Sequence, residues 1–293
     1  MARREQGIAL LIAETSVHCG VGQDVGAIDL PIQRDKVTRT PVIYGSSLKG
    51  GWRDAVHARD RRIATDLFGP RVDEDKARLE RGAVGVGEAR TLLYPVPSVQ
   101  GLFAYVTSPG ELARLRRAYT VAGVAGPQQW PAEVPGDGAA FVSGSALRFG
   151  ARTGQQVIAL GEYTLTATES EALRVFGQWV ADKLLPGKEF GYWRRALASQ
   201  SALVSDDQFR AFVDPAVVVT RVQLEEGKKT VKQGGLLTEE VLPADVILWA
   251  GLNADNGRLD RLTTALPVVV TVGGDETIGR GMLRHAILRG TAA

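Results

Sequence analysis

Cysteine and long apolar runs are nearly absent from this chain of 293 residues. Its single cysteine, Cys19, excludes an intrachain disulfide and a cysteine-based zinc site. No apolar run approaches the ~18 residues that a membrane-spanning helix needs. The short apolar stretch near the N-terminus stops at Glu14, which predicts no signal peptide. We therefore expect a cytoplasmic protein with no membrane partner.

An excess of charge of one sign is also lacking. The formal net charge is +2, which excludes the strongly basic class of histone-like proteins. The three histidines show no HxH or HExxH spacing, so no tight metal site is expected. Of the 35 basic residues, 27 are arginine. This bias has two interpretations: a GC-rich genome, or bidentate binding of phosphate by arginine.

Glycine, by contrast, is abundant. The 34 glycines gather in clusters at 20–26, 45–51, 82–87 and 273–281. Such clusters are typical of backbone that turns sharply or lies close to a ligand. Segment 45–51 lacks the GxxxxGK[ST] order of a P-loop, and 273–281 lacks GxGxxG, so neither a P-loop nucleotide triphosphatase nor a Rossmann dinucleotide site is expected.

The apolar pattern predicts helices and strands along most of the chain. We expect a strand over 7–14, a long loop over 15–42, and one helix capped by Ser46 or Ser47 that continues through Phe68. Further strands are predicted over 83–96, 101–107, 244–252, 267–272 and 283–288, helices over 109–121, 169–185, 205–212 and 256–266, and a long β-hairpin over 217–243. Residues 123–160 show no clear pattern. This order favours an α+β fold with a mainly antiparallel sheet, in a ferredoxin-like arrangement of split βαβ units.

Several residues are candidates for binding or chemistry. The helix N-terminus at 46–49, with Lys49, can form an anion site, or it can be an ordinary capped helix with a solvated lysine. The glycine loop 273–281 offers backbone amides and Arg280 to an anion, or it is a structural loop. His18 stands alone and is more often a structural residue. Loop aspartates, namely Asp24, Asp29 and Asp35, can hold a hydrated Mg²⁺ ion or close Asx turns.

Four segments together resemble a known family. The string HCGVGQDVGAIDLPIQRDKVTRTPVIYGSSLKGGWR (18–53) is similar to the N-terminal signature of the RAMP superfamily of CRISPR proteins. Within that superfamily it looks like the backbone subunits of type III-B (Cmr) effector complexes. SDDQFRAFVD (205–214), the hairpin segment 220–243 and VGGDETIGRGML (272–283) are also family-like and follow the family's order. The middle of the chain, about 108–165, does not match, and the Gly51-Trp52 pair departs from the family pattern.

The resemblance implies a fold and a set of partners. The whole chain, 1–293, would be a single RAMP-type domain, an RRM-like palm with inserted fingers and a protruding thumb hairpin at about 217–243. Copies would stack head to tail along a CRISPR guide RNA, together with other subunits of the complex, and a complementary target RNA would pair with the guide. Base pairing would then select the sequence while the protein recognises shape.

The resemblance also implies roles for individual residues. Asp29 matches the family's loop aspartate, which cleaves target RNA with a divalent metal (Mg²⁺ or Mn²⁺), and His18 would contribute at most secondarily. Whether Asp29 acts as a general base or as a metal ligand stays open. The residues expected to bind RNA are Ser46, Ser47, Lys49, Arg53, Lys228, Lys229, Lys232, Gly273, Gly274, Thr277, Gly279, Arg280 and Gly281.

The residues leave three functions open. The first is an RNA-guided endoribonuclease that is active within the assembled complex. The second is a related backbone subunit that binds guide RNA without cutting. The third is a relative that processes precursor guide RNA through His18, or an unrelated metabolic enzyme. Asp29 favours the first, and cleavage of a complementary RNA would distinguish it from the second.

Overall fold

The computed structural model describes residues 4–23, 26–70, 81–150, 154–215, 217–225, 227–228 and 230–290. Within these ranges, thirteen strands form one mixed sheet and two more pair as a separate hairpin. The sheet has the order β14-β15-β1-β13-β4-β5-β10-β6-β9-β8-β7, with β2 paired to β4 and β3 to β13. The expected α+β class is confirmed, and most pairs are antiparallel, whereas β5–β10 and β6–β9 are parallel.

The elements have the following bounds. The strands are β1 (Arg4–Ala13), β2 (Val42–Ile43), β3 (Val84–Val86), β4 (Ala89–Pro97), β5 (Phe103–Thr107), β6 (Ala139–Val142), β7 (Phe149–Gly150), β8 (Gln156–Leu160), β9 (Tyr163–Glu169), β10 (Ser201–Leu203), β11 (Val217–Leu224), β12 (Val231–Val241), β13 (Ile247–Asp255), β14 (Val269–Thr271) and β15 (Met282–Arg289). The helices are α1 (Gly45–His57), α2 (Arg61–Phe68), α3 (Pro109–Ala122), α4 (Glu171–Leu184), α5 (Gly191–Ser199), α6 (Asp206–Val213) and α7 (Arg258–Ala265). Short 3₁₀ turns are η1 (Ser145–Leu147), η2 (Lys188–Phe190) and η3 (Glu276–Ile278).

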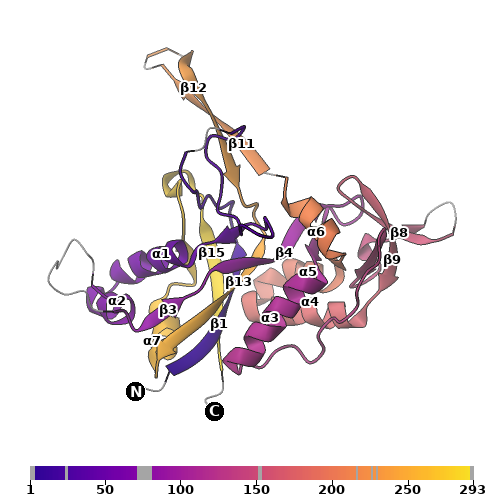
Figure 1. The fold of residues 1–293 in the computed structure, drawn as a ribbon, viewed down its shortest axis with the longest axis horizontal. Helices are drawn as coiled ribbons and strands as arrows, with labels where there is room; N and C mark the ends of the chain where they lie inside the picture. The colour runs from indigo at the N-terminus through magenta and orange to yellow at the C-terminus, as the bar shows by residue number, and fades with distance from the viewer. Residues whose placement is uncertain are drawn as a thin grey trace.

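Four consecutive strands next to the edge strand β14 have the order β15-β1-β13-β4 (Figure 1). β1 pairs antiparallel with both β13 and β15, and β13 pairs antiparallel with β4. In the chain, α1 and α2 lie between β1 and β4, and α7 lies between β13 and β15. Each helical connection therefore joins two strands that flank a third.

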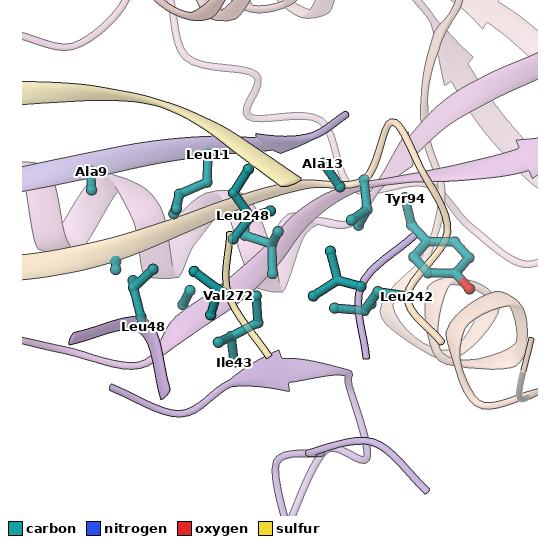
Figure 2. Close-up of a cluster of buried hydrophobic side chains, with 14 of the residues drawn as sticks. Ala9, Leu11, Ala13, Ile43, Leu48, Tyr94, Leu242, Leu248 and Val272 are labelled. Carbon is teal, nitrogen blue, oxygen red and sulfur yellow. The ribbon is translucent and has the colours of Figure 1, made fainter. Parts of the chain in front are cut away.

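β1 is buried on both faces. Alternate residues, Ala9 and Leu11, pack with Leu48 and Trp52 of α1 in one core cluster, part of which is drawn in Figure 2. The residues between them, Ile8, Leu10 and Ile12, belong to a second cluster with α3, α4 and α5. Since successive side chains of a strand point to opposite faces, two covered faces require an unbroken apolar run. The sequence GIALLIA of β1 meets that requirement.

The predicted helix over 46–68 is wrong in two respects. It is two helices, because the side chain of Asp60 accepts hydrogen bonds from the backbone N–H groups of Arg62 (2.8 Å) and Ile63 (3.0 Å) and so starts α2. α1 begins at Gly45, with Tyr44 at the N-cap, and no side chain in the described ranges caps it. The predicted caps, Ser46 and Ser47, lie inside the helix.

The pattern also missed the helix α5 and several short strands. Residues 123–160 contain β6, β7 and β8, and the predicted strand over 83–96 divides into β3 and β4 at Gly87, whose N–H donates to the Gly251 carbonyl (2.8 Å). Strands of two to five residues carry little periodicity, and pairing with distant segments stabilises them. The remaining predicted helices form, with Ser170 and Ser205 as side-chain caps of α4 and α6.

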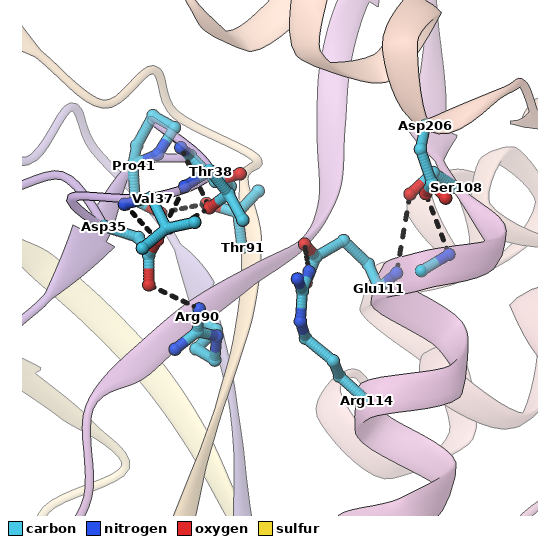
Figure 3. A network of polar contacts seen from close by, with 12 residues as sticks. Asp35, Val37, Thr38, Pro41, Arg90, Thr91, Ser108, Glu111, Arg114 and Asp206 are labelled. Carbon is cyan, nitrogen blue, oxygen red and sulfur yellow. Dashed lines mark hydrogen bonds and ion pairs between the residues drawn. The ribbon is translucent and has the colours of Figure 1, made fainter.

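The long loop between β1 and β2 is anchored at several points. Single bridges join Val17 to Leu242, Gly20 to Ile32, and Leu30 to Glu239. After them, the carboxylate of Asp35 closes a turn by accepting from Thr38 N (2.8 Å) and binds Arg90 of β4 (2.8 Å; Figure 3). The hydrogen bond from the Thr38 N–H is the main reason why the pKa of Asp35 lies far below its usual range. Asp35 thus has a structural role, and Asp24 lies outside the described residues.

The hairpin β11–β12 projects from the rest of the molecule (Figure 1). Its strands pair antiparallel from Val217↔Val241 to Leu224↔Val231, with an irregularity after Val222. Apolar side chains on it stay exposed, among them Val218, Val222 and Leu236. In the described ranges, no helix combines the length and the apolar character that crossing a membrane requires.

Candidate nucleic-acid interface

Two glycine clusters that are over 200 residues apart in sequence meet in one groove of about 580 Å³. One wall is a face of α1 that runs from Ser46 to the C-cap residue Ala58, and the other is β14 with the loop that follows it. Its lining residues are Ser46, Ser47, Gly50, Gly51, Asp54, Ala55, Ala58, Val269, Val270, Thr271, Gly273 and Glu276. The first N–H groups of a helix have no acceptor within that helix, so this wall offers donors and a positive dipole end.

Glycine is required at the points of closest approach. A Cβ on Gly51 would lie 2.6 Å from the Thr271 carbonyl oxygen, so α1 reaches β14 only without a side chain there. Gly273 has φ +95°, and a Cβ on it would lie 2.3 Å from the His18 carbonyl oxygen. Gly281, with φ +81°, has the same constraint against Val272. The glycines therefore let three segments pack against one another.

The predicted cations Lys49, Arg53 and Arg280 do not line this groove. Lys49 projects from another side of α1, where burial, with Arg53 and Arg81 nearby, lowers its pKa. Arg53 donates to the Gly69 carbonyl (3.2 Å). The groove lining contains no lysine or arginine among the described residues, and it includes the carboxylates of Asp54 and Glu276. Any anion in it would be bound by backbone N–H groups and serine hydroxyls.

Arg280 is buried in an ion-pair network instead of facing solvent. Its guanidinium binds the carboxylate of Glu239 and lies 3.3 Å from Asp275, which in turn accepts from Arg221 (2.6 Å). Glu239 is 1 % exposed, and burial is the main cause that raises its pKa. Arg280 thus joins the glycine loop to β12 of the hairpin.

Of the other predicted residues of loop 273–281, Gly281 is buried and four are on the surface. Gly273, Gly274, Thr277 and Gly279 are all exposed, and Gly279 has φ +85° at the end of the η3 turn. On the hairpin, Lys228 and Lys232 are exposed, and Lys228 lies 3.4 Å from Glu225. Lys229 lies outside the described residues.

His18 connects the first glycine loop to β12 of the hairpin and to loop 273–281. Its Nδ1 donates to the Glu240 carbonyl (2.8 Å) and lies 3.4 Å from a carboxylate oxygen of Glu239. Its own carbonyl accepts from Gly274 N (2.8 Å). The ring is 8 % exposed. These contacts fit the structural alternative for His18, because three separate segments are held together through it.

Asp29 is half-buried and bound to the hairpin. Its Oδ2 accepts from the backbone N–H and from the hydroxyl of Thr238, both at 2.7 Å, and its own N–H donates to that hydroxyl (3.0 Å). The bond from the Thr238 hydroxyl is the main cause that lowers the pKa of Asp29, so the carboxylate is ionised at neutral pH. No described residue donates a hydrogen bond to Oδ1, which is left as an acceptor.

The side chains described around Asp29 do not form a preassembled set of metal ligands. In the described ranges, no three His, Cys, Asp or Glu side chains are grouped so that they could hold a metal ion. One carboxylate can bind only an ion whose remaining ligands are water or substrate phosphates. The residues present therefore do not by themselves fit the expected divalent-metal site.

Sequence reasoning missed the residues that arrange these candidates. Gln33 joins the loop to α1: its side chain accepts from Tyr44 N (2.5 Å) and donates to the Ser47 hydroxyl (3.0 Å). Glu240 is 2 % exposed and binds Arg34 (2.6 Å). The sequence offers one signal for Glu239 and Glu240, which are consecutive carboxylates in a predicted strand next to an apolar run. Carboxylates are rarely buried without partners, so such a pair indicates that partner residues lie nearby.

Comparison with known proteins gives a consistent result. The model of the RAMP superfamily matches residues 10–284. A CRISPR system Cmr endoribonuclease Cmr4 from Pyrococcus furiosus is 29% identical, over 92% of this chain and 91% of its own. A solved structure of oligomeric Cmr4 from the same organism superimposes with TM-score 0.70 at 24% identity, over 98% of this chain and 99% of that one. A type III-B Cmr-beta complex bound to cognate target RNA contains a chain with TM-score 0.70 at 18% identity, covering 96% of each.

Proposed function

Because the chain belongs to the RAMP superfamily, we propose that it is the backbone subunit of a type III-B CRISPR effector complex, the counterpart of the fourth Cmr subunit. In this proposal it binds a guide RNA and cleaves the target RNA that pairs with it. The observation that carries the cleaving role is the half-buried carboxylate of Asp29, which is fixed through Oδ2 while Oδ1 receives no hydrogen bond from the described residues.

The fold supports the binding role. We propose that the β15-β1-β13-β4 sheet with α1 and α7 is the ferredoxin-like palm, and that β11–β12 is the thumb. The groove between α1 and loop 273–276 would hold guide phosphates through backbone N–H groups, with Ser46 and Thr277 at its rim. The exposed apolar side chains of the hairpin, such as Val222 and Leu236, would insert between nucleotides, and Lys228 and Lys232 would contact phosphates.

Copies of the chain would assemble head to tail along the guide. A heterologous contact repeats without closing and makes a helical filament. The hairpin is suited to such a contact, because it projects from the rest of the molecule (Figure 1) and carries exposed apolar side chains. Other subunits of the complex would then cap the two ends.

In the proposed reaction, Asp29 acts on the ribose 2′-hydroxyl next to the scissile phosphate. Oδ1 accepts the hydroxyl proton as the 2′-oxygen attacks phosphorus, and the 5′-oxygen leaves and takes up a proton from water. The products would carry a 2′,3′-cyclic phosphate and a 5′-hydroxyl. The alternative is that Oδ1 acts as the ligand of a divalent ion instead of as the base. Water and substrate phosphate oxygens would then supply the other ligands, and the ion would neutralise charge on the phosphate.

The test uses the assembled complex with its own guide. The protein is purified from its host under mild salt, the accompanying RNA is sequenced, and a labelled complementary RNA is then supplied with Mg²⁺, with Mn²⁺ or with EDTA. We expect short RNAs with a constant repeat-derived end. We also expect Asp29→Ala to assemble normally and to lose about 10³-fold or more in cleavage rate, as expected for loss of a general base.

Controls distinguish the alternatives. Asp137→Ala changes an exposed loop aspartate and should leave cleavage unchanged. Undiminished cleavage by Asp29→Ala would remove Asp29 from the reaction. Guide binding without any cleavage by the native complex would favour the non-cleaving backbone subunit. Absence of enriched RNA would overturn the proposal as a whole.

A further inference from the structure

Asp29 stands in a segment that does little to hold its own side chain. Residues 26–29 are bends outside any helix or strand, and Gly26 and Ala27 are exposed. The hydrogen bonds of the Asp29 side chain and backbone N–H go instead to Thr238, which lies 209 positions later on β12. The orientation of the carboxylate is therefore determined by the hairpin.

The Thr238 hydroxyl is used in both directions. It accepts from Asp29 N at 3.0 Å and donates to Asp29 Oδ2 at 2.7 Å. A hydroxyl is the smallest group that can do both at once. Together with the Thr238 N–H at 2.7 Å, it gives Oδ2 two hydrogen bonds, and no described residue donates one to Oδ1. A charged acceptor with two such donors has few orientations left.

The backbone on either side is held separately. Leu30 N donates to the Thr238 carbonyl (3.1 Å), and Glu240 N donates to the Leu30 carbonyl (3.0 Å), so the loop adds a short parallel bridge to β12. Glu240 also accepts from Ile32 N (3.0 Å) and binds Arg34. Loss of the Thr238 hydroxyl alone would therefore leave the loop docked while releasing one constraint on the carboxylate.

We propose that Thr238 is a positioning residue for target cleavage, through which the hairpin sets the orientation of the Asp29 carboxylate. Cleavage would therefore depend on the position of the hairpin, because a shift of β12 moves Thr238 and with it the Asp29 carboxylate. This inference rests on the proposed function, since it assigns Thr238 a role only if Asp29 performs the cleavage.

The experiment compares variants in the complete complex under single-turnover conditions. Thr238→Val keeps the shape and β-propensity of the side chain and removes the hydroxyl. We expect its cleavage rate at saturating target to fall about ten-fold, as for a small misplacement of a reacting group, while affinities for guide and target stay unchanged. Thr238→Ser restores the hydroxyl and should return the rate to within about two-fold of the native complex. Thr166→Val makes the same chemical change on an exposed position of β9 and is the matched control.

The outcomes separate the two proposals. If Asp29→Ala is inactive but Thr238→Val cleaves like the native complex, the positioning role is overturned and the proposed function stands. If Asp29→Ala cleaves normally, the proposed function itself fails. Equal losses in Thr238→Val and Thr238→Ser, or a loss of assembly in Thr238→Val and Thr238→Ala alike, would show that the hydroxyl does not act through the orientation of Asp29.

Discussion

β1 and β12 are both long strands, and they are held in place by different forces. β1 is buried on both faces by apolar side chains from two core clusters. β12 pairs with β11 alone over most of its length, and where it enters the molecule its buried side chains include the carboxylates of Glu239 and Glu240 beside Val241. Apolar burial makes a strand stable wherever it lies, whereas ion pairs and hydrogen bonds also specify which residues meet. The candidate catalytic residue is found beside the second kind of strand.

The largest effect on the free energy of unfolding should come from a substitution in the apolar core around β1. Trp52 is fully buried against β1. We expect Trp52→Ala to lower the free energy of unfolding by about 4 kcal/mol, because it removes a large buried side chain and leaves a cavity. Chemical denaturation followed by circular dichroism measures this. Val121→Ala, at an exposed position of α3, should change stability by less than about 0.5 kcal/mol. Equal effects of the two would contradict the assignment of Trp52 to the core.

The second prediction breaks the polar network beneath β12. Arg280→Met removes the guanidinium that binds Glu239 and leaves that buried carboxylate without its main cation, at a cost of about 3 kcal/mol in the free energy of unfolding. Arg221→Met removes a partly exposed partner of Asp275, and its cost should stay below about 1 kcal/mol. The same denaturation measurement applies. If Arg280→Met were the milder change, the network would not anchor the hairpin.

The third prediction concerns acid. His285 lies against Trp52, and burial, with Arg284 nearby, lowers its pKa from 6.5 to about 4. Above pH 6.5 the ring is neutral in folded and unfolded chains, and its stability contribution is complete. As the pH falls from 6.5 to about 4, the unfolded chain binds a proton that the folded chain does not, which costs roughly 2 to 3 kcal/mol.

Unfolding curves between pH 7 and 4 measure that loss. His285→Gln cannot take up the proton, so this component of the pH dependence should disappear. The carboxylates contribute their own acid dependence in both proteins, and the difference between the two curves isolates the histidine. Parallel curves would contradict the prediction.

The smallest effect on stability is expected at the far end of the hairpin. Lys228→Ala with Lys232→Ala should leave the free energy of unfolding within about 0.5 kcal/mol, since both side chains are exposed. If they contact RNA phosphates as proposed, the slope of log affinity against log salt should fall by about 1.4, at ~0.7 for each phosphate. Guide-binding titrations at several salt concentrations measure this. An unchanged slope would place the RNA elsewhere on the hairpin.

The sequence predicts the elements with strong local signals and does not predict their contacts. β1, α3, α6 and the β11–β12 hairpin follow from apolar runs, serine caps and a charged glycine tip. The break at Asp60 was missed because the apolar pattern continues across it. Two helices separated only by a side-chain cap therefore look like one helix in the sequence. Arg280 next to glycine suggested an exposed anion-binding loop, since nothing local shows that Glu239 will be buried beside it.

The same division applies to the whole protein. Taken by itself, the sequence determined the α+β class, the position of the hairpin, and Asp29 with the glycine segments as candidates, because apolar periodicity, turn residues and motifs are local properties of the chain. Only the tertiary structure decided that α1 meets the loop after β14, that Arg280 lies in a buried network, and that Thr238 holds Asp29. These contacts join residues that are distant in sequence, and pairing of polar groups across such distances is settled by how the sheet and its loops pack.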